Sequence, residues 1–89
     1  MSTHASHPEI IKRLKRAEGH LRSIVAMLDE GRDCLQVAQQ LQAVERAVAS
    51  AKKTLVHDHI DHCLENAVRE GARSTDDLIR EFKELSKYL

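Results

Sequence analysis

The chain has 89 residues and a formal net charge of zero at pH 7, with 14 basic and 14 acidic side chains. It contains three Gly, one Pro, one Phe, one Tyr and no Trp, and it is rich in residues that favour helices. No apolar run approaches the ~18 residues of a membrane-spanning helix, so we expect a cytoplasmic protein without a membrane partner. A domain of this size buries only ~60–65% of the surface that its unfolded chain exposes, so we also expect oligomerisation.

The first predicted helix covers residues 7–30, after a disordered arm of residues 1–6. Ser6 is its expected N-cap, and Glu9 stands three residues later, where it completes a capping box. Gly31 is the expected C-terminal cap. Between these ends, apolar residues recur at helical spacing: Ile10, Ile11, Leu14, Ala17, Leu21, Ile24, Val25 and Leu28.

A long second helix is predicted over residues 34–70, because neither Gly nor Pro occurs in that range. Asp33 is its expected N-cap. Its apolar residues alternate at spacings of four and three, which is typical of a helix packed along a partner helix. A rod of roughly 50 Å is longer than the other two helices can cover, so the pattern predicts a second subunit.

The third predicted helix covers residues 75–88, with Ser74 as its N-cap. Its apolar stripe consists of Leu78, Phe82, Leu85 and Leu89. No segment has the alternating pattern of a strand. The predicted fold is therefore a single all-α domain over residues 1–89, with three helices of which the central one is long.

Three histidines and a cysteine lie within residues 57–63. His59 and Cys63 are four residues apart, so they share one face of a helix. Neutral imidazole and thiolate are ligands for copper, nickel, cobalt and zinc. His57 and His62 point to other faces, where they support the site or lie on the surface. The segment therefore predicts a metal site, and its simpler alternative is a solvated helix surface.

The other cysteine, Cys34, lies 25 residues before His59 in the same predicted helix, which corresponds to ~38 Å along its axis. One chain therefore cannot offer both residues to one ion, whereas an antiparallel partner helix would bring Cys34 beside His59 and Cys63 of the other subunit. Cysteines of a cytoplasmic protein are expected to be reduced. His4 and His7 are candidates for a fourth ligand.

Basic residues are concentrated near the N-terminus. Between residues 10 and 22 only Glu18 opposes the positive charges of Lys12, Arg13, Lys15, Arg16 and Arg22. Such a cluster can meet the phosphates of a nucleic acid, although a solvated helix face is the common alternative. Because the net charge is zero, binding to nucleic acid would depend on this local patch.

The sequence from about residue 9 to 89 resembles the CsoR/RcnR family of bacterial metal-responsive repressors. The resemblance is carried by the run Arg13-Leu14-Lys15-Arg16-Ala17-Glu18-Gly19-His20-Leu21, by Cys34, by Gln40-Leu41-Gln42-Ala43-Val44, and by His57-Asp58-His59 with Cys63. It implies an antiparallel dimer and a dimer-of-dimers homotetramer without a helix-turn-helix. It also implies a repressor whose metal-free tetramer binds operator DNA, and whose metal-bound form releases it and derepresses a metal efflux gene.

The resemblance also implies roles for individual residues. Cys34, His59 and Cys63 fall on the intersubunit ligand positions of the family, in the Cys-His-Cys form of its Cu(I) sensors. Arg13 and Lys53 correspond to DNA-contacting residues. Charge alone adds neighbours to this DNA-binding set: Lys12, Lys15, Arg16 and Lys52.

Two departures leave the metal open between Cu(I) and Ni(II)/Co(II). Asp33 stands where copper sensors of the family commonly have Tyr, and His4 and His7 are similar to the N-terminal ligands of nickel and cobalt sensors. One alternative is a thiol-based sensor of persulfide or formaldehyde. His59 disfavours a persulfide sensor, and Ser2 stands where formaldehyde sensors of the family usually have Pro. Another is a metal chaperone that does not bind DNA. An enzyme is not expected, since no Ser-His-Asp arrangement or phosphate-binding loop is present.

Overall fold

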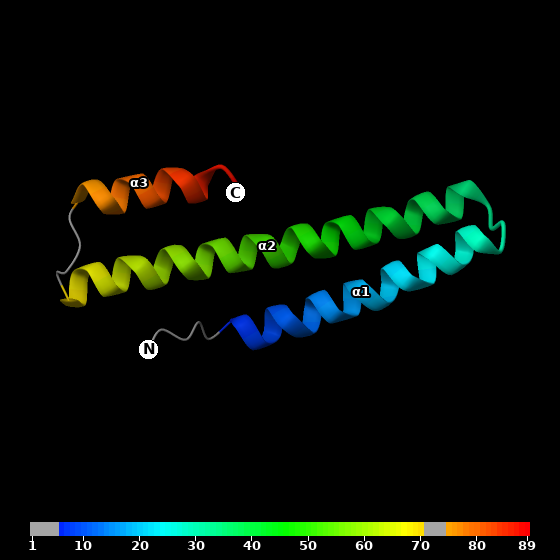
Figure 1. The fold of residues 1–89 in the computed structure, drawn as a ribbon, viewed down its shortest axis with the longest axis horizontal. Helices are drawn as coiled ribbons and strands as arrows, with labels where there is room; N and C mark the ends of the chain where they lie inside the picture. Colours follow the sequence, from blue (N-terminus) through cyan, green and yellow to red (C-terminus); the bar gives the residue numbers. More distant parts are fainter. Residues whose placement is uncertain (1–5, 71–74) are drawn as a thin grey trace. The chain divides into compact units, whose positions relative to one another are not determined.

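The computed structural model describes residues 6–70 and 75–89, which form three helices (Figure 1). These are α1 (His7–Asp29), α2 (Cys34–Glu70) and α3 (Thr75–Ser86). No strand occurs within the described ranges, so the all-α fold with a long central helix is confirmed. None of the described helices is long and apolar enough to cross a membrane. The expected arm lies outside the described residues except for Ser6.

The C-terminal end of α3 comes two residues earlier than expected. Beyond Ser86, backbone N–H groups donate to carbonyls three residues back, from Tyr88 to Leu85 at 3.0 Å and from Leu89 to Ser86 at 3.4 Å. Such tighter turns commonly satisfy the last carbonyl groups of an α-helix. The apolar stripe of the sequence therefore extends to Leu89, whereas the α-helical hydrogen bonds end at Ser86.

Gly31 ends α1 in the manner expected from the sequence. It adopts a φ of +73°. This conformation is unfavourable for every residue that has a Cβ atom, and glycine has none. Its N–H donates to the carbonyl of Leu28 at 3.1 Å, and the N–H of Arg32 donates to that of Met27 at 2.9 Å. This pair of bonds is a Schellman motif, which satisfies carbonyls that the helix leaves open.

Replacing Gly31 with Ala is expected to lower the free energy of unfolding by about 1 kcal/mol, because Ala resists a positive φ. A Cβ atom at this position would meet nothing within 4 Å, so the cost comes from the backbone alone. Gly19→Ala is the matched control, since it also meets nothing within 4 Å but lies inside α1. There Ala is favoured by up to about 1 kcal/mol. Urea unfolding at one fixed protein concentration measures both, and effects of the same sign would contradict the interpretation.

Of the three expected N-caps, Ser74 lies outside the described residues, and the other two differ in outcome. Asp33 directly precedes α2, and its carbonyl accepts the first helical bond from the N–H of Val37 at 3.1 Å. Ser6 directly precedes α1, but its buried Oγ makes no hydrogen bond to the described residues, so the capping box is not formed. Pro8 at the second helical position has no N–H, which removes one of the two donors that a cap can use.

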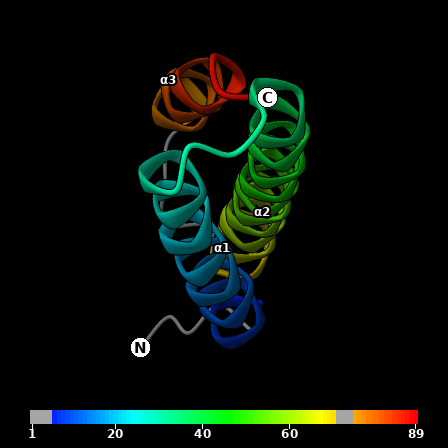
Figure 2. The same ribbon diagram turned by 90° about the vertical axis from the view of Figure 1, so that its right-hand side faces the viewer.

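The chain divides into two compact units that share α2, and a single domain over residues 1–89 stays a prediction. In the unit Pro8–Ala51, α1 lies alongside the N-terminal part of α2 (Figures 1 and 2). The core of this unit is thin. Its main cluster has four buried residues with Met27 packed against them: Ala17 and Ile24 from α1, and Val37 and Val44 from α2.

The other unit combines His7 with residues from Lys52 onward, and in it α3 lies alongside the C-terminal part of α2 (Figure 1). Val56 is buried on α2, and Leu78 and Leu85 of α3 are half-buried. This pairing places the inward face of α3 against the segment of α2 that carries the histidines and Cys63.

Candidate metal centre

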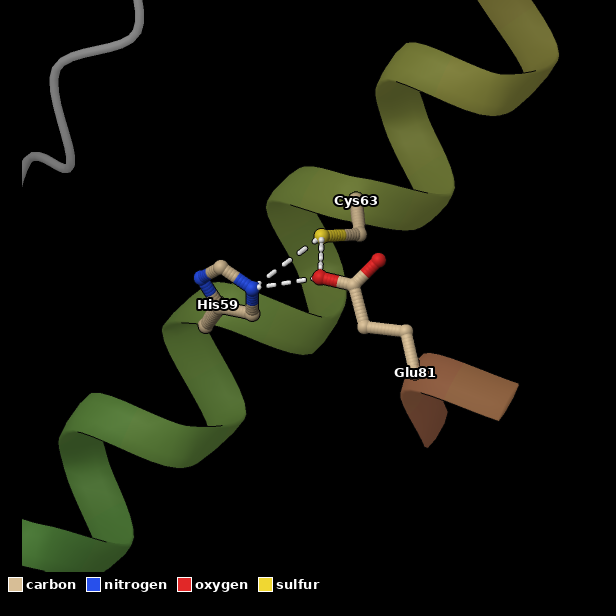
Figure 3. A network of polar contacts seen from close by, with 3 residues as sticks. All are labelled: His59, Cys63 and Glu81. Atoms are coloured by element: carbon tan, nitrogen blue, oxygen red, sulfur yellow. Dashed lines mark hydrogen bonds and ion pairs between the residues drawn. The ribbon is translucent and has the colours of Figure 1, made fainter. Parts of the chain in front are cut away.

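The unit that contains residues from Lys52 onward brings three side chains with metal-binding chemistry together, two from α2 and one from α3 (Figure 3). His59 and Cys63 are four residues apart on α2 and therefore point to the same side of the helix. Glu81 lies on α3 between Leu78 and Leu85, at spacings of three and four, on the face that packs against α2. The packing of the apolar residues of α3 against α2 thus places the Glu81 carboxylate beside the His59 imidazole and the Cys63 thiol.

The polar atoms of this group are in mutual contact. His59 Nε2 lies 2.9 Å from Glu81 Oε1, and the Cys63 thiol donates to the same oxygen at 3.3 Å. Cys63 Sγ lies 3.3 Å from His59 Nε2. One ligand atom from each residue falls within 4.8 Å of the others, and the side chains of His59 and Glu81 are 37% and 26% exposed. The group is therefore open enough for an ion to enter.

These atoms fit a transition-metal ion. In the tautomer with a proton on Nε2, His59 and Cys63 both donate to Glu81, so protons occupy the positions in which a cation would be held. When the His59 proton moves to Nδ1 and the Cys63 thiol loses its proton, an imidazole nitrogen, a thiolate sulfur and a carboxylate oxygen face one point. Imidazole and thiolate suit copper, nickel, cobalt and zinc, whereas a carboxylate oxygen favours the harder ions. Binding would release protons, so affinity rises with pH until the thiol is ionised.

The residues predicted as ligands fall in different places. His59 and Cys63 lie together, whereas Cys34 is the exposed first residue of α2, in the other unit. His4 lies outside the described residues. His7 is half-buried and shares a hollow of about 230 Å³ with His59, which Leu55, Val56 and Leu85 complete.

Two histidines of the cluster are not part of the group. His57 is exposed and His62 half-buried, and neither belongs to the set formed by His59, Cys63 and Glu81. This agrees with their expected positions on other faces of the helix.

Glu81 was missed by reasoning from the sequence. The signal was present, because Glu81 interrupts an apolar face at the spacing of Leu78 and Leu85. A carboxylate on an apolar helix face needs a polar partner, but the sequence does not say which segment supplies it.

The predicted DNA-binding residues lie on the surface of α1 and α2. Arg13 is half-buried on α1, with its Nε 3.9 Å from Oε1 of Glu9. The other five are exposed: Lys12, Lys15 and Arg16 on α1, and Lys52 and Lys53 on α2.

Comparison with known proteins places this geometry in context. A family model described as "Metal-sensitive transcriptional repressor" matches residues 6–88. The copper-sensing transcriptional repressor RicR of Mycobacterium tuberculosis is 39% identical over 70 residues, which are 79% of this chain and 73% of RicR. The copper-sensing transcriptional repressor CsoR of Bacillus subtilis is 33% identical over 81 residues, which are 89% of this chain and 80% of CsoR.

The fold also resembles that of a solved regulator. The nickel-responsive transcriptional regulator InrS superposes with a TM-score of 0.82 at 30% sequence identity. The match covers 100% of this chain and 99% of InrS. The names of these relatives therefore include both copper and nickel.

Proposed function

The chain belongs to the family of metal-sensitive transcriptional repressors, and we propose that its metal-free form binds operator DNA and releases it when a transition metal binds. The observation that carries this proposal is the group of His59, Cys63 and Glu81, which offers nitrogen, sulfur and oxygen atoms within 4.8 Å of one another. The consequence of release would be transcription of a gene for metal efflux.

We propose that the metal is shared between two subunits. Within one chain, 25 residues of a single helix separate Cys34 from His59, so the Cys34 thiolate must come from a second copy. Exposed apolar residues support a second copy, because they recur every seven residues, as they do in paired helices. These are Leu14, Leu21 and Leu28 on α1, and Leu41, Val48 and Leu55 on α2. An antiparallel dimer, paired again into a tetramer, would cover them.

We propose Ni(II) or Co(II) as the cognate ion, on the basis of the donors that surround His59. The carboxylate of Glu81 contacts the ring, and His7 shares a hollow with it. Additional oxygen and nitrogen donors suit these divalent ions, whereas Cu(I) prefers soft sulfur ligands. InrS, which is nickel-responsive, covers the whole chain in the structural match.

Cu(I) is the second candidate. Two thiolates and one imidazole, from Cys34, Cys63 and His59, suit this soft ion without a further donor. The relatives RicR and CsoR are copper-sensing repressors.

The coupling between metal and DNA would start at the contact between α2 and α3. When His59 and Cys63 turn their nitrogen and sulfur atoms to a cation, both lose the proton through which they donate to Glu81. Glu81 then either joins the ligands or loses both bonds, and in each case the contact between the helices changes. If the resulting subunit geometry fits DNA less well, DNA must weaken metal binding by the same factor.

A gel shift with a duplex from the protein's own promoter region tests the proposal. We expect the metal-free protein to retard this duplex, and one of Ni(II), Co(II) or Cu(I), added without oxygen, to weaken binding by ~5–150-fold. Bands from d–d transitions would report the geometry of bound Ni(II) or Co(II), and a scrambled duplex controls for non-specific binding. Tight metal binding without any DNA binding would identify a metal chaperone instead.

A further inference from the structure

A second hollow lies in the unit Pro8–Ala51, away from the residues of the metal centre. It has a volume of about 240 Å³, and it is lined by Arg13, Arg16, Ala17, His20, Ala47 and Ser50. The α1 residues of this set share one helix face, at spacings of three, four and seven. The hollow exists because the apolar lining is formed by the small side chains Ala17 and Ala47.

The lining is positive and rich in hydrogen-bond donors. Two guanidinium groups, an imidazole and a hydroxyl surround the space, and none of the six lining residues is acidic. The carboxylate of Glu9 approaches Arg13 only at 3.9 Å and is 61% exposed, so it offsets little of this charge. The ring of His20 is held in place, because its Nε2 lies 2.5 Å from Oε1 of Gln40.

We propose that this hollow receives a phosphate group of the DNA backbone, which makes Arg16 and Ser50 positioning contacts alongside Arg13 and places the phosphate beside the ring of His20. Guanidinium groups match phosphate oxygens in a two-pronged geometry that few other anions satisfy. The volume equals that of roughly eight water molecules, which is room for a tetrahedral oxyanion with part of its hydration. This inference rests on the proposed binding of operator DNA, and a free phosphate ion would share the same chemistry.

A phosphate contact fixes the position of the protein on the duplex but carries no sequence information. Loss of the contact should therefore weaken binding to the operator and to a scrambled duplex by the same factor. It should also lower the slope of log affinity against log salt concentration by about one.

Two variants of the full-length, metal-free protein separate the hollow from charge in general. Arg16→Gln removes one guanidinium, and Ala47→Leu fills the space without changing the charge. Arg46→Gln is the control, because Arg46 is an exposed residue of α2 that lies outside the basic patch of residues 12–22 and does not line the hollow. Fluorescence anisotropy with both duplexes is expected to show about tenfold weaker binding for Arg16→Gln and Ala47→Leu, and less than about twofold for Arg46→Gln.

Titration with inorganic phosphate supplies a readout without DNA. We expect saturable shifts of the His20 ring resonances in NMR spectra, assigned with His20→Gln, and we expect Ala47→Leu to abolish them. If phosphate moves these resonances but Ala47→Leu leaves DNA affinity unchanged, the hollow binds a free anion and the DNA contact is overturned. If neither readout responds to Ala47→Leu, the hollow is not a phosphate site. If the wild-type protein does not bind the operator, the proposed function is wrong. The phosphate titration would still show whether the hollow binds an anion.

Discussion

Replacing Cys63 with serine is expected to lower metal affinity by more than the ~10–100-fold that loss of an outer contact costs, because it removes a proposed ligand. Serine is uncharged and nearly the same size, so DNA binding by the metal-free variant should remain. The variant should therefore repress without responding to metal. Competition with a chelator of known affinity measures the loss, and His57→Ala is the control because His57 is exposed on the same helix outside the group.

Mixing variants tests whether each site is built from two chains. Cys34→Ser alone and His59→Ala alone should both lose tight metal binding. In an antiparallel dimer that contains one chain of each kind, one of the two sites keeps its full set of ligands. Random mixing after mild unfolding should therefore restore about a quarter of the wild-type sites. No recovery would show that the ligands come from one chain or from a different arrangement.

The same variants separate a metal sensor from a thiol sensor. A protein that responds to persulfide or formaldehyde needs a reactive cysteine, and it does not require the imidazole of His59 as a ligand. Release of DNA by such a reagent in His59→Ala, with no metal response in the wild-type protein, would favour the thiol sensor. We expect the reverse, because His59 contacts both Cys63 and Glu81.

The fold could be predicted from the sequence because its signals are local. Helical spacing along α1, the positive φ required at Gly31 and the absence of Gly or Pro through α2 each depend on neighbouring residues. The capping box is a local signal too, but it was wrong: Pro8 leaves the N–H of Glu9 as a donor for Ser6, and Ser6 Oγ does not bond to it. These features need no knowledge of which segments meet in space.

The site could be predicted only in part, because it depends on contacts between distant segments. His59 and Cys63 were found since both lie on one helix, whereas Glu81 is 18 residues from Cys63 and reaches it only through the packing of α3 on α2. The hollow beside Arg16 likewise depends on two alanines from different helices. Spacing along one helix identifies a face, but it does not say which face of another helix covers it.

Replacing Glu81 with glutamine is expected to weaken Ni(II) and Co(II) binding by ~10–100-fold. Glutamine keeps the size of the side chain but loses the negative charge that lies 2.9 Å from His59 Nε2. Cu(I) should be affected less, because it carries a single charge and binds most strongly to the sulfur atoms of the site. Glu84→Gln is the matched control, since Glu84 lies on the same helix, exposed and paired with Lys87 at 3.2 Å.

Chelator competition for Ni(II) and Co(II), together with an oxygen-free titration of Cu(I), would measure both affinities for the Glu81 and Glu84 variants. A selective loss of the divalent ions makes the carboxylate a determinant of metal choice, as the surroundings of His59 predict. An equal loss for all three ions would mean that Glu81 acts only by orienting His59 and Cys63 through its two hydrogen bonds. In that case the choice of Ni(II) or Co(II) would rest on His7 and on the likeness to InrS, and Cu(I) would become the better candidate.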